Sequence, residues 1–228
     1  MSSHEKQSQA ETLVSDGHLQ IKAGNHEQAL SLFLEAADLY AEDSNLKDQA
    51  AQLQVVSEIY RLTNQFDQAI ETYRVLIALF EQLKDYDAMI RILNNMGLLQ
   101  TMSGKFQDAL ECFQKAFSIS ERIGNNLYMA QQLGNMGSAC RDMKEYEKAL
   151  ENYQKAFSLY EVLGIQEGVA DQSTNIAYIH AMEDRKEDAL NWYQKAFPIY
   201  QEVKSEEKAQ FTEQNIMNLR EALGKPTS

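Results

Sequence analysis

The sequence predicts an all-α fold, a solenoid of five stacked helical hairpins followed by one capping helix. Three observations predict it. An Ala-Leu or Ala-Ile pair returns every forty residues, at 29–30, 69–70, 109–110, 149–150 and 189–190. An aromatic residue follows each of these alanines by four positions. The 228 residues include only 2 Pro and 10 Gly, so few residues interrupt helices. A period of about 20 to 50 residues is typical of stacked units.

The second helix of each hairpin is predicted from the segment around the alanine. Ala149, Tyr153 and Ala156 are separated by four and three residues, which places them on one face of a helix. A small alanine lets a neighbouring helix approach closely, and the aromatic ring fills the space beside it. The aromatic positions of the five copies are Phe33, Tyr73, Phe113, Tyr153 and Tyr193.

The first helix of each hairpin is predicted from a second periodic segment that precedes the alanine. In the fourth copy, residues 129–143, Leu133, Met136 and Ala139 form an apolar stripe. Within these segments, small residues are expected where the paired helix comes closest: Gly17, Gly97 and Gly137.

The turns between helices are predicted from glycine and asparagine. Gly24, Asn64 and Gly104 are expected to end first helices, and Gly124 and Gly164 to end second helices. Asn45 and Asp85 stand near the corresponding positions of the other copies. Pro198 lies inside a predicted second helix, where we expect a kink or a lost hydrogen bond.

The repeats define the domain organisation. We expect repeats over residues 9–205 and a capping helix over 206–223, with a polar outer face that protects the end of the stack. Residues 1–8 and 224–228 are expected to be disordered.

Composition narrows the function classes. The formal net charge of −13 argues against a nucleic-acid partner, which requires a basic face, and against an anionic membrane surface. No apolar stretch is long enough for membrane insertion, and the polar beginning of the chain does not resemble a signal peptide. We therefore expect a cytoplasmic protein. Cys112 and Cys140 lie in helical patterns and are expected to be buried free thiols.

The repeated residues resemble the tetratricopeptide repeat (TPR) family. In the fourth copy the family pattern is carried by Leu133, Met136, Gly137, Cys140, Ala149, Tyr153 and Ala156. The repeat is 40 residues long instead of about 34. The proline usual at the end of the repeat is replaced by Glu81, Glu121, Glu161 and Gln201. This long form is similar to the arrays of kinesin light chains, of spindle-orientation adaptors that bind G-protein regulators, and of some bacterial signalling proteins.

The resemblance implies a right-handed α-solenoid whose first helices line a concave groove. One groove position recurs as asparagine, and an amide with donors and an acceptor suits the backbone of an extended peptide. Arg61, Arg91 and Arg141 could pair with peptide carboxylates. The alternative is that the asparagines set the stacking of helices and the arginines are solvated or paired within the array. The expected peptide-binding residues are Gln54, Glu58, Arg61, Arg91, Asn94, Asn95, Gln131, Asn135, Ser138, Arg141, Asp171, Asn175, Tyr178 and Asn215.

The sequence predicts a non-catalytic scaffold or adaptor that binds a peptide segment of a partner protein. No catalytic residue, metal site or cofactor is expected, because the sequence has no nucleophile elbow, acid–base constellation, phosphate loop or metal-ligand spacing. His180 is interpreted as a packed core histidine. Two alternatives stay open: self-assembly into a homo-oligomer or end-to-end stack, and a bacterial-type sensor of a regulatory peptide or small molecule.

Overall fold

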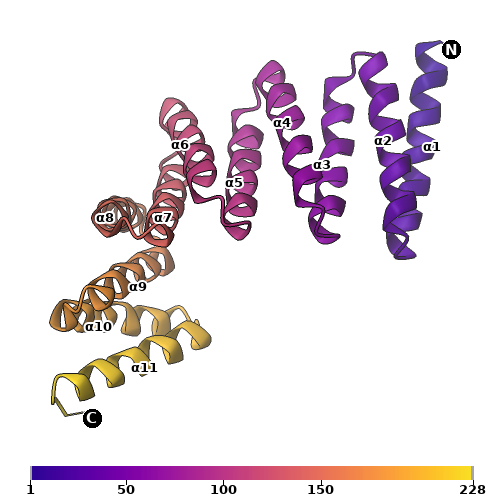
Figure 1. Ribbon diagram of the computed structural model, residues 1–228. Helices are drawn as coiled ribbons and strands as arrows, with labels where there is room; N and C mark the ends of the chain where they lie inside the picture. The colour runs from indigo at the N-terminus through magenta and orange to yellow at the C-terminus, as the bar shows by residue number, and fades with distance from the viewer. Residues whose placement is uncertain (1, 227–228) are drawn as a thin grey trace. The chain divides into compact units, whose positions relative to one another are not determined.

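The computed structural model describes residues 2–226, which form eleven α-helices and no strand (Figure 1). The all-α prediction is confirmed. In chain order the helices are α1 (Ser3–Lys22), α2 (His26–Glu42), α3 (Leu46–Leu62), α4 (Phe66–Leu83), α5 (Tyr86–Met102), α6 (Phe106–Ile123), α7 (Asn126–Asp142), α8 (Tyr146–Leu163), α9 (Gln166–Met182), α10 (Lys186–Glu202) and α11 (Glu206–Ala222). None of the helices in the described part of the chain has the length and apolar character needed to cross a membrane.

The chain divides into two compact units, Met1–Leu99 and Gln100–Ser228, with the boundary inside α5. In unit 1, α2 packs against both α1 and α3, and α3 packs against α4. In unit 2, the helices from α6 to α11 pack in chain order, each against the next. Each unit is therefore a stack of helical hairpins.

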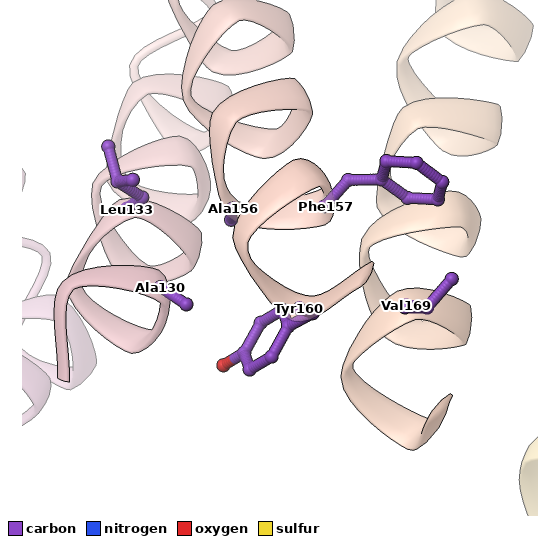
Figure 2. Packing of buried hydrophobic residues seen from close by; sticks show 6 residues of the cluster. All are labelled: Ala130, Leu133, Ala156, Phe157, Tyr160 and Val169. Carbon is purple, nitrogen blue, oxygen red and sulfur yellow. The ribbon is translucent and has the colours of Figure 1, made fainter. Parts of the chain in front are cut away.

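The core of each hairpin is the alanine and aromatic face that the sequence predicts. All five recurring alanines are fully buried, and the five aromatic residues that follow them are at most 2% exposed. A second layer joins one hairpin to the next in unit 2. Figure 2 shows it in the cluster of Ala130 and Leu133 on α7, Ala156, Phe157 and Tyr160 on α8, and Val169 on α9.

Glycine allows the first helix to approach the aromatic residue of its partner. A Cβ atom on Gly137 would lie 2.6 Å from Cδ1 and Cε1 of Tyr153. A Cβ atom on Gly17 would lie 2.9 Å from the ring of Phe33. The prediction of close helix approach is confirmed at these two positions.

The turns agree with the sequence analysis where glycine or asparagine ends a helix. Gly24, Asn64 and Gly104 have φ values of 77°, 59° and 72°, and Gly124 and Gly164 both have 70°. At two other turns the left-handed residues are Ser44 and Lys84. Asn45 and Asp85 follow them and instead begin the next helix, because their side-chain oxygens accept hydrogen bonds from the backbone N–H groups of Asp48 and Ala88.

The expectation of disorder over residues 1–8 is wrong for residues 3–8, which belong to α1. Ser2 Oγ accepts from the Glu5 N–H at 3.3 Å, and Glu5 Oε2 accepts from the Ser2 N–H at 2.8 Å. This reciprocal capping box stabilises the start of the helix. Lys6 adds an ion pair to Glu42 on α2 at 2.6 Å. Residue 1 lies outside the described residues.

The end of the chain is also more structured than expected. Gly224 adopts a φ of 64°, and the Lys225 N–H donates to the carbonyl of Arg220 at 2.8 Å, which ends α11 with a left-handed cap. Residues 227–228 of the expected disordered tail lie outside the described residues. Pro198 does not end α10, which continues to Glu202.

The outer face of α11 is mostly polar; Met217, at the register of Gly137 on α7, is an apolar exception and is 42% exposed. On α7, Ala130, Leu133 and Cys140 contact residues of α8. The helix α9 is followed by a partner, α10, whereas no helix follows α11 in the described residues. At the α11 positions stand Gln210, Glu213 and Arg220. A helix with these polar residues can end the stack in contact with water.

Candidate peptide-binding face

The candidate site is the surface formed by α7, α9 and α11 in unit 2, called here the first-helix face. Three contacts show that these helices are neighbours. The Gln172 side chain of α9 lies against Gly134 of α7, Arg141 of α7 lies over Tyr178 of α9, and Lys208 of α11 pairs with Asp171 of α9. Spacings of three and four residues bring the predicted side chains to one side of each helix. They are Gln131, Asn135, Ser138 and Arg141 on α7, Asp171, Asn175 and Tyr178 on α9, and Asn215 on α11.

Asn135, Asn175 and Asn215 stand forty residues apart, at one register of the three helices, and each is half-buried. Asn215 Nδ2 donates to the carbonyl of Phe211 at 2.8 Å, within its own helix. Asn175 makes no side-chain hydrogen bond to any residue of the described range 2–226. Its amide is therefore available to a ligand.

Arg141 is held in place from two sides. Its Nε donates to Asp142 Oδ1 at 2.8 Å, and its Cζ lies 5.8 Å from the centroid of the Tyr178 ring. Within the described part of the chain, its Nη groups donate to no side chain. Tyr178 is 42% exposed, so the stacked pair is open to solvent.

Asp171 connects helices, whereas the sequence analysis expected it to contact a ligand. Its Oδ1 accepts from the hydroxyl of Tyr200 on α10 at 2.8 Å, and its two oxygens accept from Nζ of Lys208 on α11 at 2.8 and 3.0 Å. Burial, together with the hydrogen bond and negative charge of Asp171, raises the pKa of Tyr200. The carboxylate thus joins α9, α10 and α11.

Ser138 is also engaged inside the hairpin. Its Oγ accepts from the Tyr153 hydroxyl at 3.1 Å and donates to the carbonyl of Gly134 at 3.2 Å. The Tyr153 hydroxyl is protonated at neutral pH, and burial raises its pKa still further. Gln131, in contrast, is exposed on α7.

The remaining predicted residues lie in unit 1. On α3, Nε and Nη2 of Arg61 donate to the two carboxylate oxygens of Glu58 at 2.8 and 2.5 Å, and this lowers the pKa of Glu58. Arg61 is therefore paired within the array, which is the alternative to contact with a peptide carboxylate. Gln54 lines a depression of about 570 Å³ between α3 and α4. Arg91 and Asn95 are exposed on α5, and Asn94 is half-buried there.

Two exposed apolar residues of the first-helix face were not predicted from the sequence. Met182, one turn after Tyr178, is 52% exposed, and Phe211, one turn before Asn215, is 58% exposed. A comparison of equivalent positions could have found Phe211, because the residues forty and eighty positions earlier are the polar Asp171 and Gln131.

His180 is a buried residue behind this face, as predicted. It is 8% exposed, and its Nδ1 has no hydrogen-bond partner in the described residues and lies 4.0 Å from Asp188 Oδ2. Burial and the positive charge of Arg185 lower the pKa of His180, although Asp188 and Glu183 oppose this effect.

The lowered pKa predicts that acid destabilises the fold through His180. The unfolded chain, with a histidine pKa of about 6.5, binds the proton more readily than the folded chain. The contribution of His180 to stability is therefore complete above about pH 6.5 and is lost as pH falls toward the lower folded value. Urea unfolding of wild type and His180→Gln from pH 8 to 5 should show a smaller pH dependence in the variant. Parallel curves would contradict the prediction.

Comparisons with known proteins agree with the helical-hairpin fold. No curated protein matches the sequence. The chain is similar to the solved structure of BtubC (BKLC) from P. vanneervenii, with 17% identity and a TM-score of 0.71 over 98% of this chain and 85% of that one. It is similar to the apo form of RapI, with 17% identity and a TM-score of 0.82 over 98% of this chain and 65% of that one.

The expected similarity to kinesin light chains is confirmed at the level of fold. TPR-like repeats of a kinesin light chain from P. anserina share 11% identity and a TM-score of 0.67, over 86% of this chain and 96% of that one. The family model described as Tetratricopeptide repeat matches residues 50–122, 88–162 and 128–202. Because these matches span more than half of the sequence, the chain belongs to the tetratricopeptide repeat family.

Proposed function

We propose that the chain is a non-catalytic scaffold that binds a peptide segment of a partner protein on the first-helix face of unit 2. Asn175 carries the proposal, because its half-buried amide forms no side-chain hydrogen bond within the described residues. A packing role would engage the amide, as it does for Asn215. An asparagine amide both donates and accepts, so it can pair with the backbone of an extended peptide.

The surroundings of Asn175 favour binding with little loss of entropy. Ser138 and Asp171 fix the neighbouring helices through the hydroxyls of Tyr153 and Tyr200. Arg141 is oriented before any ligand arrives. A surface that is already ordered loses less conformational freedom on binding. Tyr178, Met182 and Phe211 add exposed apolar area for side chains of the peptide.

The mostly polar outer face of α11 supports this role over end-to-end stacking through that helix. A second copy docked there would cover Glu213 and Arg220, and buried charges without partners are costly.

The test uses peptides selected from a random 12-residue library displayed on phage, with the full chain immobilised. We expect Asn175→Ala to weaken binding of the selected peptides about three- to tenfold, as for the loss of about one hydrogen bond. Fluorescence anisotropy with labelled synthetic peptides measures the change. The matched control is Asn191→Ala, which removes an exposed asparagine from α10, away from the first-helix face. Equal affinities of wild type and a folded Asn175→Ala variant would reject the proposed face.

A further inference from the structure

The chemistry of the peptide can be inferred from Arg141, and this inference rests on the proposed function. An arginine that is already held through Nε and stacked on a ring keeps a planar edge with two Nη groups. In Arg141, Asp142 supplies the Nε contact and Tyr178 the ring. The side chain is only 31% exposed, so its position is restricted before a ligand arrives.

Arg61 and Arg185, which are also paired, differ in this respect. Arg61 gives both Nε and Nη2 to Glu58, and Arg185 gives Nη2 to Glu183. On the first-helix face, the second cation, Lys208, is occupied by Asp171 and Glu167. Of these two cations, Arg141 is therefore the one whose terminal Nη groups donate to no side chain within the described residues.

We propose that the bound peptide supplies one aspartate or glutamate side chain, whose carboxylate accepts hydrogen bonds from the Nη groups of Arg141. The planar guanidinium matches two carboxylate oxygens in a way that a lysine ammonium does not. A neighbouring apolar residue of the peptide packs against Tyr178 and Met182, which lie one turn apart on α9 and are 42% and 52% exposed. Asn175, one turn before Tyr178, holds the backbone.

Charge limits the ligand to a single acidic residue. Asp142 is already beside Arg141, and the whole chain carries a net charge of −13. In a run of acidic residues, the carboxylates that do not reach the Nη groups would lie near Asp142 and be repelled by it. One carboxylate in contact with Arg141 gains a short-range interaction, while charges farther away than about 8 Å are largely screened at physiological ionic strength.

The experiment selects the same displayed library on wild type and on Arg141→Gln. Display at the phage N-terminus leaves no free carboxyl end on the peptide. We expect wild type to enrich peptides with one Asp or Glu beside a large apolar residue, and Arg141→Gln to enrich no such pattern. With a synthetic, C-terminally amidated peptide, Arg141→Gln should weaken binding about tenfold or more, as for the loss of a charged hydrogen bond. Arg141→Lys should restore only part of this loss.

A change in the peptide separates recognition from any effect of the variant on folding. Replacing the acidic residue by its amide should weaken binding to wild type about tenfold and change binding to Arg141→Gln little. Equal losses in both proteins, or enrichment of neutral or basic peptides that still depend on Asn175, would overturn this inference and leave the proposed function standing. Binding that requires a free C-terminal carboxylate would also overturn it. If the library yields no peptide whose binding is weakened by Asn175→Ala, both this inference and the proposed function are contradicted.

Discussion

Replacing Gly137 by Ala is expected to lower the free energy of unfolding by about 1–2 kcal/mol, although the same change stabilises an ordinary helix. The added Cβ would lie 2.6 Å from two ring atoms of Tyr153. That ring is fully buried, and its hydroxyl is bonded to Ser138, so it cannot withdraw without loss of packing. Overpacking typically costs about 1–3 kcal/mol, and the better helix propensity of Ala returns only about 0.5–1 kcal/mol.

Gly134, one turn earlier on the same helix, provides a matched control. A Cβ there would lie 3.3 Å from Nε2 of Gln172, the end of a flexible side chain that can move. Gly134→Ala is therefore expected to be neutral or to stabilise by up to about 1 kcal/mol. Urea denaturation followed by circular dichroism measures both variants. Equal effects of the two substitutions would contradict the role assigned to Gly137.

The contrast between these two glycines illustrates what the sequence reveals. Gly137 and Tyr153 lie sixteen residues apart in one hairpin, and the same relation links Gly17 and Phe33 in another. A contact that recurs with the forty-residue period is visible in the sequence, because each copy repeats the same packing problem. The helices, their paired faces and the glycine turns could be predicted for this reason.

The ends and the irregular turns could not be predicted from the period. The cap formed by Ser2 and Glu5 occurs once, so no repeat indicates it. Ser44 and Lys84 adopt left-handed backbone because the helices on both sides impose it, and their residue types give no such preference. Asn45 and Asp85 stand next to them, and their residue types do indicate a structure. They indicate the start of a helix, not its end.

The candidate site follows from register, and register does not reveal which of its side chains are already bonded within the chain. The period assigns Asp171, Ser138 and Asn175 to equivalent sides of their helices. The partners of Asp171 lie 29 and 37 residues away, on two other helices. Tyr200 and Lys208 have polar atoms placed by the packing of α10 and α11, and this placement requires the structure.

Asp171→Ala is expected to lower the free energy of unfolding by about 2 kcal/mol and to loosen α11 in particular. The change removes the acceptor of Tyr200, a residue only 2% exposed, and leaves its hydroxyl near Thr174 Oγ1 at 3.3 Å. It also removes the carboxylate that binds Lys208 of α11. Loss of a hydrogen bond to a charged group costs about 1.5–3 kcal/mol, and the Tyr200 hydroxyl keeps Thr174 Oγ1 as its remaining partner.

Glu167→Ala separates this role from a simple loss of charge. Glu167 also accepts from Lys208 at 2.8 Å, but it is exposed, and exposed ion pairs contribute about 0–1 kcal/mol. Urea denaturation gives the global stability of each variant, and amide hydrogen exchange reports the opening of α11. Asp171→Ala should speed exchange in α11 more than in α7, and Glu167→Ala should leave both close to wild type. If both substitutions destabilise α11 equally, surface charge and not the Asp171–Tyr200 contact holds this helix, because of the two carboxylates only that of Asp171 contacts the buried hydroxyl.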